Sequence, residues 1–375
     1  MRIVHLISYF DEQTSYEEVI TSKLQANLKD NKVFILTSRY PSKDILNSRL
    51  RPFGKHFLQD NLVLISLRSL VIRNDFIFLI GLFYNLYKIR PNIVHAHGLY
   101  QPSNLICYLF SKILNFKLIY DHHDYFFPTH IFCYRGKNLV KNIFRLYYIH
   151  ILTPLIRNII TNTRKVVAVD PKSYDHLAEW FKIDKKFIFL NELCVDTENF
   201  YFVEENKFNI VTEKTNFLLT GIINRRKLYD QVILPFLDTP SVNLYIIGDG
   251  ETDYVNELKH KYRNFENIFF VGNVKNDQLK YYYSLMDYSL FIFNASISIL
   301  ETLACGVLPI YMSDLQFKGA LKLGIKIDNM SNYNAHLFGG QLKIERSKRA
   351  SLIHFIEREY SYKKYISMLN EIYEN

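Results

Sequence analysis

Residues 291–310, FIFNASISILETLACGVLPI, carry the strongest fold signal in this chain. An apolar run ends near Phe293, a short polar loop follows, and a helical pattern then begins with Glu301 in its first turn. In such a strand–loop–helix unit, loop amides and the positive end of the helix favour an anion such as a diphosphate. The loop residues expected at this anion site are Asn294, Ser296, Ile297 and Ser298. Ionised Glu301 only accepts hydrogen bonds, which suits two vicinal hydroxyls such as those of a ribose.

The same alternation of short apolar runs and helical patterns continues along the whole chain, which indicates repeated βαβ units around parallel sheets. Strands are expected at residues 3–7, 32–36, 62–67, 93–97, 117–120, 166–169, 187–190, 217–220, 242–247, 268–271, 288–292 and 308–311. We therefore predict an α/β protein with two doubly wound, Rossmann-like domains that face each other across a cleft. The predicted domains are residues 1–200 and 201–355, followed by a segment, 356–375, whose helix could pack back on the first domain.

A second candidate site lies after the strand at 217–220, in TGIINRRKLYD. Three adjacent bases, Arg225, Arg226 and Lys227, follow Gly221 at the mouth of the predicted sheet, where they could clamp phosphate oxygens. Gly248 and Gly250 follow the next strand, and residues without a Cβ allow a ligand to approach the backbone. A solvated turn with tight glycines is the alternative interpretation.

Composition limits the classes of protein to which this chain could belong. The 375 residues hold 46 Lys and Arg against 37 Asp and Glu, for a net charge of +9. Four scattered cysteines without CxxC spacing argue against a disulfide framework or structural zinc, so we expect a cytoplasmic protein. The opening residues resemble a first strand rather than a signal peptide, and the apolar run 76–86 is too short to cross a bilayer and predicts a buried helix.

Part of the positive charge is concentrated in residues 137–172, which hold seven bases and one acid. A solvated helix face and a surface that docks on anionic lipid at the inner face of the cell membrane are both compatible with this pattern. No RNA-binding motif or zinc-finger spacing is present, so we expect no nucleic-acid partner.

Histidines end one strand of the first half, in VHAHG at 94–98, and follow the next strand, in DHHD at 121–124. Alternation places His95 and His97 on one face of a strand, so that one would line a cleft and the other would be a core polar group. A neutral His123, or His122 one position earlier, could bind a sugar hydroxyl and be oriented by Asp124.

Taken together, these motifs resemble family 4 glycosyltransferases of the GT-B fold, bacterial surface polysaccharide type. LETLACGVLPI is similar to that family's LEAMACGxPVI segment, and PNIVHAHGLY, LIYDHHDYF, VVAVDPKSYDHL, NELCVDTENF, LLTGIINRRKLYD, LYIIGDGE and IFFVGNVKNDQLKYYYSLMDYSLF follow the family order over nearly the whole chain. The resemblance implies a retaining sugar transferase that uses a nucleotide diphosphate sugar, UDP-linked, with no catalytic metal and no separate cofactor. The implied acceptor is a hydroxyl of a lipid-linked glycan.

The resemblance also assigns residues. It implies that Lys227, with Arg226 or Arg225, holds the donor phosphates in the loop that begins at Gly221. Glu301 matches the second glutamate of the family's E-x7-E motif, which holds the ribose, and His123 matches the histidine that contacts the donor sugar. His123, Lys227 and Glu301 are thus the implied catalytic residues. Two positions depart from the family pattern, because Ile222 replaces its arginine and Phe293 its first glutamate.

Two other functions remain open from the residues alone. His95, His97, Asp121, His122, His123 and Asp124 could form the metal cluster of a phosphoesterase. A non-catalytic homologue that binds or assembles with a partner would explain Ile222 and Phe293.

Overall fold

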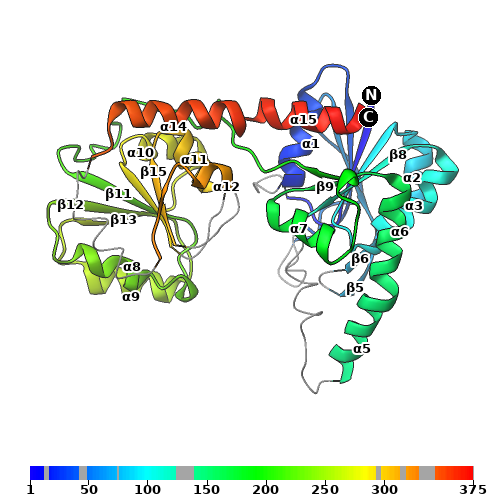
Figure 1. Cartoon of the computed structure of the whole chain (residues 1–375), viewed down its shortest axis with the longest axis horizontal. Helices are drawn as coiled ribbons and strands as arrows, with labels where there is room; N and C mark the ends of the chain where they lie inside the picture. Colours follow the sequence, from blue (N-terminus) through cyan, green and yellow to red (C-terminus); the bar gives the residue numbers. More distant parts are fainter. Residues whose placement is uncertain are drawn as a thin grey trace. The chain divides into compact units, whose positions relative to one another are not determined.

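The structure, a computed structural model, describes residues 1–11, 17–41, 49–73, 76–123, 139–292, 297–312, 318–328 and 343–374. The chain divides into two compact units, Met1–Glu192 with Ile366–Asn375 (unit 1) and Leu193–Tyr365 (unit 2). The sequence-based boundaries were 200 and 355, so the structure begins unit 2 earlier and ends it later. Each unit is an α/β layer structure (Figure 1).

The sheet of unit 1 has the strand order β10-β9-β8-β7-β1-β2-β4-β3, and only β3 runs antiparallel to its neighbour. Its strands are β1 (Arg2–Ile7), β2 (Lys32–Ser38), β3 (Gly54–Gln59), β4 (Leu62–Leu67), β7 (Ile93–His97), β8 (Lys117–His122), β9 (Val166–Ala168) and β10 (Ile188–Leu190). A separate antiparallel pair is formed by β5 (Ser69–Arg73) and β6 (Phe76–Leu79).

The helices of unit 1 are α1 (Glu17–Asn27), α2 (Leu82–Ile89), α3 (Pro102–Leu114), α5 (Leu139–Tyr147), the π turn η1 (Tyr148–Leu152), α6 (Thr153–Thr163), α7 (Pro171–Glu179) and the 3-10 turn η2 (Lys185–Phe187). The prediction of one buried helix over 76–86 is wrong, since a strand ends at Leu79 and a helix starts at Leu82. Gly81 separates them with a φ of 86°, which a glycine adopts without strain.

Unit 2 has an all-parallel sheet with the order β13-β12-β11-β14-β15-β16. Its strands are β11 (Thr215–Thr220), β12 (Val242–Ile247), β13 (Ile268–Gly272), β14 (Tyr288–Phe291), β15 (Leu308–Tyr311) and β16 (Ile325–Lys326). Its helical segments are η3 (Arg225–Lys227), α8 (Tyr229–Ile233), η4 (Leu234–Phe236), α9 (Thr252–Tyr262), η5 (Asn276–Gln278), α10 (Leu279–Tyr283), α11 (Ser298–Ala304), α12 (Lys318–Leu321) and α14 (Arg346–Glu359).

Two apolar layers cover the faces of this second sheet. Figure 1 shows α8 and α9 on one face and α10, α11 and α14 on the other, and a separate hydrophobic cluster fills each interface. The last helix, α15 (Tyr362–Glu374), passes from unit 2 into unit 1. In unit 1 the Nζ atoms of Lys117 and Lys165 donate to carbonyls of its final turn, which suits the negative end of a helix.

Candidate functional site

The strand order of unit 2 fixes where a ligand is expected. From β11 the chain proceeds through β12 to β13 on one side, and β14 then starts on the other side of β11. The sheet therefore has a topological switch point between β11 and β14, and open α/β sheets bind ligands beyond the carboxyl ends of the strands at such a point. The loop with Lys227 follows β11, and the segment with Glu301 follows β14.

Lys227 lies over the backbone of Gly221. A methyl group built on Gly221 would come 3.2 Å from the Lys227 Nζ, and Gly221 has a φ of 118°. The Asn224 side chain accepts from the Lys227 amide and caps η3, which fixes the turn. Burial lowers the pKa of Lys227 from its ordinary value, and its ammonium makes no hydrogen bond or ion pair with a described residue. A partly buried cation is thus held at the carboxyl end of β11.

Of the three adjacent bases, Arg225 is engaged in a contact outside the loop. Arg225 Nη2 forms an ion pair with Glu257 at 2.6 Å, and its guanidinium stacks 4.7 Å from the Tyr254 ring centre. Both partners belong to α9, so the Arg225 guanidinium is bound to that helix. Arg226 is exposed and makes no side-chain bond with a described residue, which leaves it as the base that could join Lys227.

Gly248 and Gly250 have a structural reason to be glycine. A methyl group on Gly248 would lie 2.1 Å from the Gly221 carbonyl oxygen, and one on Gly250 would lie 1.9 Å from that of Ile223. The first loop also donates two backbone hydrogen bonds, from the Gly221 N–H to the Ile247 carbonyl and from the Ile223 N–H to the Asp249 carbonyl. These glycines therefore let the loop after β12 pack against the loop that carries Lys227.

Glu301 is a buried acid in α11. Only 9% of it is exposed, and burial raises its pKa to about 7. Its carboxylate makes no hydrogen bond with a described residue. Burial, and then the charge of Glu301, raise the pKa of Tyr283, whose hydroxyl lies 3.2 Å from the Thr220 Oγ1 at the end of β11. Tyr283 thus connects the surroundings of Glu301 to the strand end that precedes Gly221.

The predicted anion loop is described only in part. Phe293, Asn294 and Ser296 fall outside the described residues. Ile297 precedes α11 as its N-cap without a side-chain cap, and Ser298 is the first residue of the helix.

Strand alternation separates the histidines of unit 1. On β8, His122 faces α7, where its Nε2 lies 2.7 Å from the Nδ1 of His176. Asp121 and His123 face the other side, and the His123 Nδ1 lies 3.1 Å from the Asp121 carboxylate. Asp124, the residue expected to orient His123, falls outside the described residues. His123 has a side chain that is 30% exposed.

His95 and His97 are both buried, so the expectation that one of them lines a cleft is wrong. Asp121 contacts His97 Nδ1 and also accepts from the Gly98 amide at 2.9 Å. Burial alone would raise the pKa of Asp121, but His97 and His123 lower it well below its ordinary value.

Sequence reasoning missed Thr220 and Tyr283, and it named Asp121 only as a candidate metal ligand. A tyrosine in a Tyr-rich helix carries no sequence signal for such a contact. The contact of Asp121 with His123 could have been predicted, because alternation along β8 puts the two residues on the same face.

Comparisons with known proteins agree with this architecture. Residues 202–323 match the family model described as glycosyl transferases group 1. Sucrose-phosphate synthase from Thermosynechococcus elongatus is similar in structure, with a TM-score of 0.69 at 14% identity over 100% of this chain and 98% of that one. Anabaena HepE in complex with UDP gives a TM-score of 0.70 at 12% identity, covering 99% of each chain. WaaG, a glycosyltransferase involved in lipopolysaccharide biosynthesis, gives 0.65 at 11% identity, covering 99% of each.

The chain has the GT-B fold. The prediction of two Rossmann-like α/β parts is thereby confirmed. A search of curated protein sequences finds no match. Within the described residues, no helix combines the length and the apolar character needed to cross a membrane.

Proposed function

We propose that this chain is a retaining, metal-independent glycosyltransferase that moves a sugar from a nucleotide diphosphate sugar to an acceptor hydroxyl. The observation that carries the proposal is the placement of Lys227 and Glu301 after β11 and β14, the two strands that flank the switch point of unit 2. The match of residues 202–323 to group 1 glycosyl transferases covers both positions and supports it.

The chemistry needs little beyond charge and position. When the bond between the sugar carbon and the diphosphate oxygen breaks, negative charge grows on the leaving group. The Lys227 ammonium, with Arg226 beside it in sequence, would stabilise that charge more strongly in the transition state than in the bound donor. The acceptor oxygen forms the new bond to the same carbon on the same face, and its proton passes to the oxygen of the departing diphosphate. Glu301 would hold the ribose by accepting from its two hydroxyls.

We assign UDP as the nucleotide part of the donor and a surface polysaccharide as the pathway. The support comes from similar structures: HepE was solved with UDP, and WaaG is described as acting in lipopolysaccharide biosynthesis. In unit 1, we propose that His123 contacts a sugar hydroxyl. Its Nδ1 lies 3.1 Å from the Asp121 carboxylate, which favours the tautomer with the proton on Nδ1.

We also propose that unit 1 docks on anionic lipid through α5, η1 and α6. Large apolar side chains are exposed along one stripe of these helices: Leu139, Ile143, Leu146, Tyr147, Ile151 and Leu155. Figure 1 shows α5 extending away from the sheet of unit 1. Such a stripe, with bases nearby, is typical of a helix that lies in the membrane interface.

The predicted basic cluster contributes only part of this surface. Arg157 Nε donates to the Phe181 carbonyl, and Lys165 Nζ donates to the Ile372 carbonyl, so both bases have structural partners. Arg164 and Lys172 are exposed and can meet lipid headgroups. Lys137 falls outside the described residues.

Calorimetric titration with UDP tests the donor site. We expect Lys227→Met to weaken binding at least tenfold, because a charge-assisted bond to phosphate is lost. Arg225→Ala is the matched control, since its guanidinium is already paired with Glu257. Equal losses in both variants, or none in Lys227→Met, would contradict the assignment.

Turnover of nucleotide sugars with and without a chelator separates the alternatives. Release of UDP that persists when the chelator is added only during the assay, to protein whose fold is shown to be intact, supports the transferase. Phosphoester cleavage that the chelator abolishes would instead indicate the metal hydrolase. Tight UDP binding with no turnover on any donor would indicate a non-catalytic homologue, the outcome that the exposed Ile222 would favour.

A further inference from the structure

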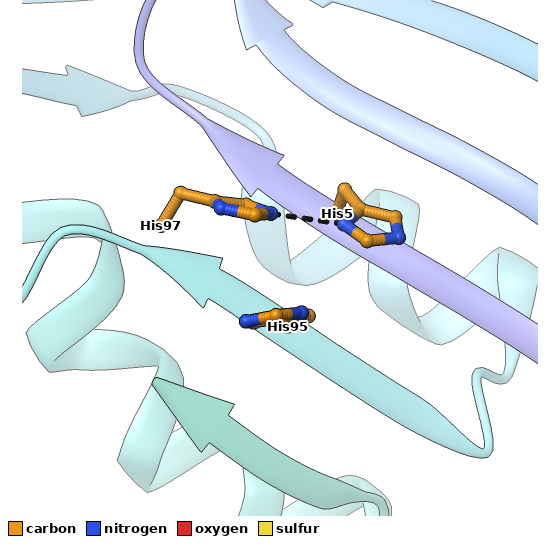
Figure 2. A group of neighbouring side chains, drawn as sticks. All are labelled: His5, His95 and His97. Carbon is orange, nitrogen blue, oxygen red and sulfur yellow. Dashed lines mark hydrogen bonds between the residues drawn. The ribbon is translucent and has the colours of Figure 1, made fainter. Parts of the chain in front are cut away.

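Three histidines meet in the interior of unit 1, on the side of Asp121 that faces away from His122, and Asp121 contacts both His97 and His123. His5 lies on β1, and His95 and His97 lie on the adjacent strand β7, with His5 and His95 directly opposite each other in the parallel register. Their exposed fractions are 0%, 0% and 4%. Figure 2 shows the three rings gathered over the two strands. They sit at the switch point of the first sheet, where β2 and β7 flank β1.

The rings are close enough to share a ligand. One nitrogen from each residue lies within 4.8 Å of the other two, and the His5 Nδ1 is 2.9 Å from the His97 Nε2. Zinc binds imidazole nitrogens at about 2.0–2.1 Å, so in a tetrahedral site these nitrogens are about 3.4 Å apart. Side-chain shifts of about 1 Å would therefore bring the three nitrogens to the spacing that a bound zinc ion requires.

The protonation state of the cluster suits a metal. Burial, followed by the charge of His97, lowers the pKa of His5 well below its ordinary value and that of His95 to about 3. Neutral imidazole is the form that ligates metals. The His5 Nε2 is buried and makes no hydrogen bond with a described residue.

The surrounding groups resemble the outer shell of a metal site. Asp121 contacts the His97 Nδ1, which leaves the His97 Nε2 lone pair directed at His5. The same carboxylate lies 3.7 Å from the His95 Nε2, and the Tyr373 hydroxyl lies 2.9 Å from the His95 Nδ1. Metal-bound histidines commonly pass their other N–H to a carboxylate in this way, and a buried anion offsets the charge of a cation.

We propose that His5, His95 and His97 bind one divalent transition-metal ion of the zinc class. Three imidazoles favour Zn²⁺, Co²⁺ or Ni²⁺ over Mg²⁺ and Ca²⁺, which prefer oxygen ligands. Because the three side chains are buried, we assign the ion a structural role in joining β1 to β7, and Tyr373 of α15 contacts His95 in the same cluster. The inference rests on the geometry of the three histidines and not on the proposed transferase reaction, whose Lys227 and Glu301 belong to unit 2. Asp121 is the residue that the cluster shares with His123.

Metal analysis of the purified full chain tests the site. After growth with added Zn²⁺, or after refolding in its presence, we expect close to one zinc per chain by elemental analysis. His97→Asn and His5→Asn should each lower the zinc content at least tenfold. His176→Asn is the matched control, because it removes a buried histidine of the same unit that pairs with His122 outside the cluster.

A second measurement covers variants that fail to fold. Wild-type protein stripped with a chelator should lose thermal stability and regain it with Zn²⁺, and Co²⁺ should give the visible absorption of a tetrahedral nitrogen site. Less than a tenth of an equivalent of zinc after refolding with Zn²⁺, together with an unchanged melting temperature, would overturn the proposal. The proposal would also be overturned if the His97→Asn variant kept its zinc and the His176→Asn variant lost it.

Discussion

At the scale of single residues, Glu301 is the most informative side chain. A carboxyl buried in a helix is costly to ionise, and here burial raises its pKa to about 7. Such an acid is stable only if its surroundings leave it neutral or if a ligand supplies donors to its charged form. In the account proposed above, the ribose hydroxyls are those donors, so nucleotide binding and ionisation of Glu301 are linked.

This linkage predicts a pH-dependent affinity for UDP. Hydroxyl donors bind the ionised carboxylate better, so affinity should rise with pH up to about pH 7 and level off above it. The limiting slope is tenfold per pH unit for one proton. Glu301→Gln should remove the change of UDP affinity with pH that arises from this carboxyl. Glu301→Ala should weaken UDP binding at least tenfold, roughly 1.4 kcal/mol. Titration calorimetry from pH 5.5 to 8.5 measures both, and identical slopes in wild type and Glu301→Gln would contradict the role.

At the scale of elements, the loops after β11 and β12 act as one unit. Gly248 lets the second loop contact the carbonyl of Gly221, and hydrogen bonds from Gly221 and Ile223 join the two loops. The position of the Lys227 ammonium over Gly221 therefore depends on a neighbour that has no charge and no contact with a ligand.

Gly248→Ala should damage the site through the backbone. Its new methyl group would lie 2.1 Å from a backbone oxygen at a φ of 137°, so we expect a loss of stability on the order of 2 kcal/mol or more and weaker UDP binding. Gly272→Ala is the control, because it also has a positive φ but meets no atom within 4 Å. Urea unfolding and UDP titration of both variants measure the difference. Equal effects would show that backbone strain alone, and not the contact between loops, explains the result.

At the scale of the whole molecule, the exposed apolar stripe on α5, η1 and α6 is the feature that distinguishes a membrane-docking surface from a surface that is only basic. Pro154 at the start of α6 lacks an N–H, and the π turn η1 lies directly before α6 in the chain. Ile143 on α5 and Ile151 within η1 remain exposed, each at 57%.

Replacing both isoleucines by glutamate should release the protein from membranes. Each buried isoleucine contributes about 1.5–3 kcal/mol, so we expect the fraction bound to phosphatidylglycerol-containing vesicles to fall more than tenfold. Ile113→Glu on α3 is the control, since it is equally apolar and 67% exposed but lies outside the stripe. Co-sedimentation with vesicles measures the bound fraction. Binding lost only when salt is raised, and unaffected by the double variant, would show that charge alone holds the protein.

Much of the fold could be predicted because parallel strands are buried on both faces and are therefore nearly continuous apolar runs. The strands at 62–67, 93–97, 242–247 and 308–311 were placed at their observed bounds. β3 was missed because its exposed and half-buried residues alternate, and β6 was merged with α2 because a short apolar run does not distinguish strand from helix.

For the candidate site, the sequence predicts which residue types lie at which strand ends, but not which side chains pair with one another. Lys227 and Glu301 follow adjacent strands, as the doubly wound pattern requires. The pairing of Arg225 with Glu257 could not be predicted, because it depends on the orientation of α9. The three-histidine cluster also joins residues 5, 95 and 97 through a strand order that the sequence does not specify.

A crystal structure of the protein with UDP tests the central claim most directly. We expect the ribose hydroxyls within hydrogen-bond distance of the Glu301 carboxylate and a phosphate oxygen about 3 Å from the Lys227 Nζ. UDP bound elsewhere on unit 2, or bound with both side chains turned away from it, would contradict the account.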